Sequence, residues 1–104
     1  MSPDCAVIIP HYNDTRRLDR CLAALSAQDL EGAEVVVVDN ASSEPLDALM
    51  ARYPAVRFVT ESRRGAALAR NRGVRETVAP HLFFLDADCI PAADWLMAGV
   101  MPVM

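Results

Sequence analysis

Four short apolar runs, separated by segments of helical spacing, constrain the fold of this chain more than any other feature. The runs lie at residues 5–9, 34–38, 56–59 and 82–85. The first is unbroken until Pro10, which is typical of a strand buried on both faces of a parallel sheet. The second is almost pure valine, whose branched side chain favours strands. We therefore predict four strands connected by helices.

The intervening segments have the spacing of amphipathic helices. The first carries apolar residues three or four positions apart, at Leu18, Cys21, Leu22 and Leu25. Asn13 or Asp14 is expected to cap this helix. A second helix is predicted to start at residues 42–45, where serines precede Glu and Pro, and to turn its apolar side chains inward: Leu46, Leu49 and Met50. A third is expected over 65–78, and a fourth opens at Pro91.

Alternation of strands and helices predicts an α/β fold, with a Rossmann-like, mostly parallel sheet and helices on both of its faces. Gly73, inside the third helix, costs about 1 kcal/mol relative to Ala and so predicts close packing against the sheet. Ligands of such sheets bind outside the carboxyl ends of the strands. Polar residues follow three of the four strands, at 10–13, 39–40 and 86–88. These clusters are expected to converge on one site.

Composition excludes several classes of protein. Residues are 53% hydrophobic and 23% charged, and the net charge is −4, which argues against a nucleic-acid partner. No apolar run approaches the ~20 residues of a membrane span, and the N-terminus lacks the pattern of a secretory signal. We therefore expect a cytoplasmic domain, whose membrane association would require parts outside this chain. Cys5, Cys21 and Cys89 are expected to be small hydrophobes without disulfides.

Asp86-Ala87-Asp88 follows the last strand and predicts a metal site. Two carboxylates at the end of a buried strand can face one divalent cation, Mg²⁺ or Mn²⁺, whose remaining ligands a diphosphate would supply. The alternative is a solvated turn, which is the commoner reading of the bare tripeptide. The buried strand before the motif, and Pro91 and Trp95 after it, favour the metal.

Asp39 ends the second strand and has two compatible readings. A carboxylate at this point of a nucleotide-binding unit commonly accepts hydrogen bonds from a ribose or a base. It can equally cap the next helix, as can Ser42. The first strand, by contrast, is followed by His11-Tyr12-Asn13 rather than a glycine-rich phosphate loop, which argues against a dinucleotide-dependent dehydrogenase or a P-loop NTPase.

The motifs at 7–13, 37–42, 65–73 and 86–96 occur in one order and together resemble the N-terminal half of family-two glycosyltransferases. The resemblance implies a GT-A fold, a nucleotide-sugar donor that is usually UDP-linked, a divalent metal and an inverting transfer to an unidentified acceptor. The residues that it implies are Pro10, Tyr12 and Asn13 in the nucleotide cleft, Asp39 at the base, Arg70 near the base or phosphates, Asp86 at the ribose or metal, and Asp88 as metal ligand.

Family members carry the acceptor site and the general base further along the chain. No candidate for that base stands out here, since neither His11 nor Asp94 has a supporting pattern. We therefore expect residues 1–104 to form the donor-binding half of a truncated domain that is inactive by itself. The alternative is a non-catalytic module that binds a nucleotide or self-associates, with a homo-oligomer covering an exposed sheet edge.

Overall fold

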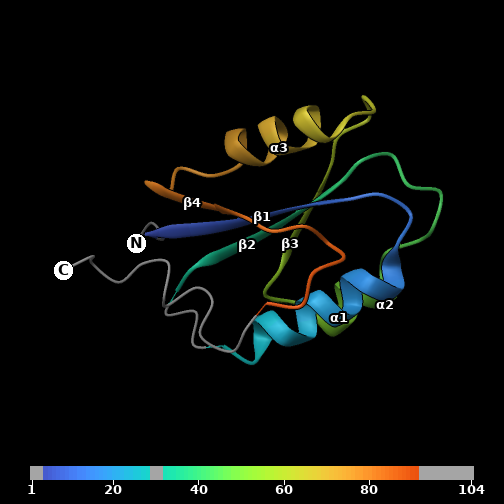
Figure 1. The fold of residues 1–104 in the computed structure, drawn as a ribbon, viewed down its shortest axis with the longest axis horizontal. Coiled ribbons are helices and arrows are strands. Elements are labelled where there is room, and N and C mark those ends of the chain that lie inside the picture. The colour runs from blue at the N-terminus through green and yellow to red at the C-terminus, as the bar shows by residue number, and fades with distance from the viewer. Residues whose placement is uncertain (1–3, 29–31, 92–104) are drawn as a thin grey trace.

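Four parallel strands form a sheet between two layers of helices (Figure 1). The computed structural model describes residues 4–28 and 32–91. The strands are β1 (Cys5–His11), β2 (Glu34–Asp39), β3 (Arg57–Thr60) and β4 (His81–Phe84). The helices are α1 (Thr15–Ser26), α2 (Asp47–Arg52) and α3 (Ala66–Arg75). The alternating order and the parallel sheet confirm the predicted fold class.

The strand order β3-β2-β1-β4 places the reversal of the sheet between β1 and β4. Val7 of β1 pairs with Val35 of β2 on one side and with Phe83 of β4 on the other. From β1 the chain crosses first toward β2 and β3, and later returns to add β4 on the opposite side of β1. The carboxyl ends of β1 and β4 therefore flank the position where sheets of this type bind ligands.

Alternate residues of the central strands build two apolar layers. On one face Val7, Ile9 and Val37 pack in one cluster with residues of α1 and α2. On the other face Ile8 and Val36 cluster with Ala69 of α3, and Figure 1 shows that α3 is the helix covering this face among the described residues. Helices therefore lie on both faces, as predicted, and they hold the ends of the strands in a fixed relation.

Gly73 lets α3 lie directly on the sheet. A Cβ at this position would stand 2.4 Å from Ile8 Cγ2 and 3.2 Å from Val38 Cγ2. The first distance is shorter than any ordinary carbon–carbon contact, so only glycine fits without a shift of the helix. The predicted close packing is confirmed. This packing sets the distance between α3 and the strands β1 and β2.

The second helix differs from the prediction because loop side chains bind the backbone ahead of it. α2 begins at Asp47 and not at residues 42–45. Asn13 Oδ1 accepts hydrogen bonds from the amides of Ser43 and Glu44, at 2.8 and 3.1 Å. Because these two amides are bound in a loop, the helix begins only at Asp47. The expectation that Met50 faces inward is also wrong, because Met50 is 47% exposed.

The third helix ends at Arg75, three residues before the predicted end at 78. The fourth predicted helix, from Pro91 onward, lies outside the described residues apart from Pro91 itself. None of the helices in the described ranges is long and apolar enough to cross a membrane. All three cysteines are free, as expected, although Cys89 is exposed and only Cys21 is fully buried.

Candidate functional site

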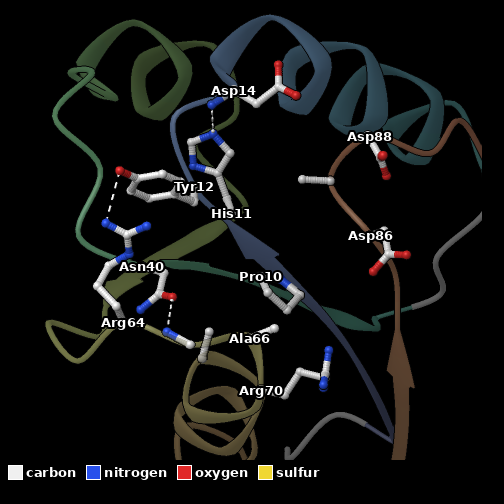
Figure 2. Close-up of a pocket in the computed structure, with 13 residues that line it drawn as sticks. Pro10, His11, Tyr12, Asp14, Asn40, Arg64, Ala66, Arg70, Asp86 and Asp88 are labelled. Carbon is white, nitrogen blue, oxygen red and sulfur yellow. Dashed lines mark hydrogen bonds between the residues drawn. The ribbon is translucent and has the colours of Figure 1, made fainter.

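A pocket of about 620 Å³ opens at the carboxyl ends of β1 and β4, where the strand order reverses. Its walls come from residues 10–12 and 14, from residue 40 after β2, from 64–66, 69 and 70 around the start of α3, and from 86–88 after β4. Figure 2 shows the acidic pair on one side of the pocket, Tyr12 with Arg64 on the other, and Arg70 below. Segments far apart in the sequence thus meet at the predicted edge.

The acidic pair is fixed by the sheet and by a tight turn. Leu85 is buried and donates its amide hydrogen to the carbonyl of Ile8 at 3.1 Å, which continues the pairing of β4 with β1. The Cys89 amide then closes a turn onto the carbonyl of Asp86 at 3.0 Å. Side-chain donor atoms of Asp86, Asp88 and Cys89 all lie within 4.8 Å of one another. Both carboxylates are exposed and line the pocket.

The thiol of Cys89 lies beside the two carboxylates of the acidic pair. Its Sγ lies 3.7 Å from Asp88 Oδ1 and donates a hydrogen bond to it. Desolvation, and then the carboxylates of Asp88 and Asp86, raise the pKa of the Cys89 thiol. The two carboxylates supply the oxygen donors of this cluster. Oxygen donors suit Mg²⁺ and Mn²⁺ better than soft, thiolate-seeking cations.

Positive potential lies below the acidic pair, at the start of α3 (Figure 2). Gly65 is the N-cap residue and has no side chain to bind the amides of the first turn, which lines the pocket through Ala66 and Ala69. The N-terminus of a helix carries partial positive charge and unpaired amide hydrogens, which favour anions. Arg70 lies one turn into this helix, and in the described part of the chain it forms no ion pair. Its guanidinium is therefore available to an anionic ligand.

Tyr12 and Arg64 form the side of the pocket that lies away from the acidic pair (Figure 2). The guanidinium carbon of Arg64 stands 3.7 Å from the centroid of the Tyr12 ring, and its Nη1 donates to the Tyr12 hydroxyl at 3.0 Å. Arg63 and Arg72 instead pair with Glu61 and Glu76. The sequence predicts at least two of these arginines to be surface charge and does not single out Arg64 for the site.

Asp39 lies behind the pocket rather than in its wall. Its Oδ1 accepts a hydrogen bond from His11 Nδ1 at 3.2 Å, and its Oδ2 accepts one from the Ser42 amide at 3.2 Å. The amide of Asp14 donates to His11 Nε2 at 2.9 Å, so the neutral ring carries its proton on Nδ1. Asp39 thus closes a turn onto Ser42 and does not cap the next helix, because α2 begins at Asp47 and has no side-chain cap. Its contact with a base stays a prediction.

Asn13 also lies apart from this pocket. With Asp14 it lines a smaller hollow beside the arginines at positions 16, 17 and 20. Its backbone amide donates to Ser42 Oγ at 2.8 Å, and its side chain binds the loop before α2. The predicted site residues that meet in the main pocket are Pro10, Tyr12, Arg70, Asp86 and Asp88.

Asp14 and Arg64 line the pocket without having been assigned to it from the sequence. Asn40 belongs to the polar cluster after the second strand, which was expected to reach this site, and it does line the pocket. Arg64 lies in a loop before α3, and no local pattern distinguishes it from its neighbour Arg63.

The chain matches the family model of glycosyl transferase family 2 over residues 6–102. Glycosyltransferase AglE of Haloferax volcanii is 32% identical over 97% of this chain, which corresponds to 36% of AglE. Validoxylamine A glucosyltransferase of Streptomyces hygroscopicus is 34% identical over 92% of this chain and 24% of its own length. The chain thus spans only about a quarter to a third of these relatives.

Solved structures have the same fold. S. aureus TarS, solved as residues 1–349, superposes with a TM-score of 0.82 at 24% identity, over 95% of this chain and 31% of that chain. A mannosyltransferase from Pyrobaculum calidifontis, solved in complex with GDP-Man and Mn²⁺, superposes with a TM-score of 0.78 at 31% identity, over 92% of this chain and 33% of its own. The sheet is of the GT-A type expected from the sequence, and the chain belongs to glycosyl transferase family 2.

Proposed function

We propose that the pocket binds a nucleotide-sugar donor together with a divalent cation, and that the protein transfers the sugar to an acceptor with inversion at the anomeric carbon. The observation that carries the proposal is the opposition of charges across one pocket. Asp86 and Asp88 lie on one side, Arg64 lies on the other, and Arg70 and the start of α3 lie below. A diphosphate chelated to a cation has both kinds of charge and complements both walls.

Asp88, with Asp86, would hold the cation, because their oxygens are the donors that Mg²⁺ and Mn²⁺ prefer. When bound, the ion supplies Lewis-acid stabilisation of the negative charge on the departing diphosphate. The complex of the Pyrobaculum mannosyltransferase with Mn²⁺ supports a divalent cation here. Arg70 and the free amides of the first turn of α3 would bind the phosphates from below (Figure 2).

Tyr12 would pack against the base, and Pro10 would line the cleft between base and diphosphate. We propose UDP as the nucleotide on the strength of the family resemblance. GDP is the competing candidate, since the Pyrobaculum enzyme was solved with GDP-Man. Asp39 would reach the base edge only if a ligand drew it away from His11 or Ser42.

Activation of the acceptor hydroxyl is assigned to residues outside this chain. An inverting transfer needs a general base. His11 is unsuited, because both of its ring nitrogens already hold hydrogen bonds to Asp39 and Asp14. We therefore propose that residues 1–104 bind the donor without completing the transfer. Sugar transfer by the 104-residue chain alone would contradict this part of the proposal.

Isothermal titration calorimetry tests donor binding. UDP and GDP are titrated into the chain with Mn²⁺, with Mg²⁺ and with EDTA. The proposal expects binding of one nucleotide that depends on the cation, and a loss of at least tenfold in affinity for Asp88→Asn, which keeps the shape of the side chain. Asp47→Asn is the matched control, because Asp47 is an exposed carboxylate at the start of α2. Equal binding with EDTA, or by the Asp88 variant, would overturn the proposal.

A further inference from the structure

Asn40 follows β2 and is 6% exposed, and its side-chain amide is fully engaged by the loop before α3. The Nδ2 group donates one hydrogen bond to the carbonyl of Glu61 at 3.0 Å and another to the carbonyl of Arg63 at 2.7 Å. The Oδ1 atom accepts the amide hydrogen of Gly65 at 2.9 Å. Two donors and one acceptor are thus matched to two carbonyls and one N–H.

These three bonds hold the backbone on both sides of Arg64. The carbonyl of Arg63 and the amide of Gly65 belong to the peptide groups that flank Arg64. Gly65 has φ +142°, a left-handed conformation that favours glycine, and it directly precedes α3. Figure 2 shows the bond from Asn40 to this turn beside the guanidinium that lies on Tyr12. Asn40 therefore joins β2 to the part of the pocket wall that carries Arg64.

Glu61 anchors the other end of the same loop. Its amide donates to the carbonyl of Asp39 at 2.9 Å. Its carboxylate accepts hydrogen bonds from the amide and Nε of Arg63, at 3.0 and 3.1 Å, and lies 3.5 Å from Nη2 of Arg75 on α3. The end of the loop next to Arg64 and the pocket depends, in contrast, on the side chain of Asn40.

We propose that Asn40 is a positioning residue of the pocket, whose neutral amide sets the place of the Arg64 guanidinium and of the first turn of α3. With respect to the ligand, a nucleoside diphosphate, the inference rests on the proposed function. A carboxylate of the same shape cannot take this role. It would bring an unprotonated oxygen to the carbonyls of Glu61 and Arg63, where the amide now donates two hydrogen bonds.

The first test needs no ligand. Amide hydrogen exchange is measured by NMR on the 104-residue chain and on Asn40→Asp. The Gly65 amide is expected to exchange at least tenfold faster in the variant, because repulsion between the new carboxylate oxygen and the carbonyls of Glu61 and Arg63 moves the side chain away from this amide. Asn71→Asp is the matched control: the same chemical change at an exposed position of α3, with no effect expected at Gly65. Unchanged exchange at Gly65 in Asn40→Asp would overturn the proposal.

The second test asks whether Asn40 acts through Arg64. Affinity for UDP or GDP with Mn²⁺ is measured for Asn40→Asp, Arg64→Ala and the double variant. Asn40→Asp is expected to lower affinity by about tenfold when Arg64 is present, the size of one lost charge-assisted hydrogen bond, and by less than twofold when Arg64 is already replaced. Fully additive losses would show that Asn40 affects binding independently of Arg64 and would contradict a positioning role.

Asn40→Ser serves if the Asp variant does not fold, since it removes the amide without placing a charge against the carbonyls. The same two outcomes then decide the inference. Failure of the wild-type chain to bind either nucleotide would count against the proposed function only. The exchange rate of Gly65 would still decide whether Asn40 holds the loop.

Discussion

The imidazole of His11 connects the ends of the two central strands, with its Nδ1 3.2 Å from Oδ1 of Asp39. His11 is 2% exposed, and its Nε2 accepts the amide hydrogen of Asp14 at the start of α1. One buried ring thus joins β1, β2 and α1 directly behind the pocket. Such a ring is a structural support and not a free base.

Replacement of His11 by alanine is expected to destabilise the chain by about 2 kcal/mol, because it leaves a buried carboxylate and a backbone amide without their partner. Urea unfolding followed by circular dichroism measures the change. His81→Ala is the control, since His81 is exposed at the start of β4, and its free energy of unfolding is expected to stay within about 0.5 kcal/mol of wild type. Equal stability of the two variants would contradict the support role of His11.

Gly73→Ala tests the close packing of α3 against the sheet. Alanine is the better helix former by about 1 kcal/mol, so an unconstrained site would gain stability. Here the added Cβ meets Ile8 Cγ2 at 2.4 Å, and overpacking costs about 1–3 kcal/mol. After the gain in helix propensity we expect a net loss of up to about 2 kcal/mol. Thermal and urea unfolding give the sign. A stabilised variant would show that α3 can move away from β1 without cost.

The carboxyl of Glu61 is expected to make the stability of the folded chain sensitive to acid. The hydrogen bonds from Arg63 lower the pKa of its carboxyl from 4.5 to about 2. A folded-state pKa below the unfolded one contributes stability that is fully present above pH 4.5 and is lost as the pH falls toward 2. Glu61→Gln should therefore be less stable than wild type at pH 6, with the gap closing between pH 4.5 and 2.

Urea unfolding at a series of pH values measures this gap. Glu44→Gln is the control, because Glu44 is exposed and its carboxylate accepts only a long hydrogen bond from the Thr15 amide, at 3.4 Å. A gap for Glu61→Gln that did not change with pH would mean that the charge on Glu61 contributes nothing to the folded state.

The two central strands could be predicted from the sequence because each is a run of apolar residues that only a buried interior accommodates. The predicted first and second strands end within two residues of their observed ends at His11 and Asp39. The local pattern of apolar residues was therefore sufficient to place these two strands. Parallel strands bring their carboxyl ends to one edge, so the polar clusters after the strands were expected to converge. The residues that the family resemblance implied, Pro10, Tyr12, Arg70, Asp86 and Asp88, line one pocket, and their contacts with a ligand remain predictions.

Side chains that bind distant backbone could not be predicted in this way. Asn13 holds the amide of Ser43, 30 residues away, and so shifts the start of α2. Asn40 similarly holds Gly65, 25 residues away, and brings Arg64 into the pocket wall. Such contacts depend on which strands become neighbours, and no local spacing records them. Asp39 and Asn13 were expected to face a ligand, whereas their bonds in the structure are to neighbouring loops.

Paramagnetic broadening by Mn²⁺ tests most directly whether the acidic pair and the start of α3 belong to one donor site. Amide resonances of the chain are recorded with Mn²⁺ alone and then with Mn²⁺ and UDP or GDP. We expect broadening at residues 86–88 that extends to residues 65 and 66 once the nucleotide is present. Asp88→Asn is expected to abolish this broadening. Broadening that does not change when the nucleotide is added, or that does not affect residues 86–88, would contradict a single donor site.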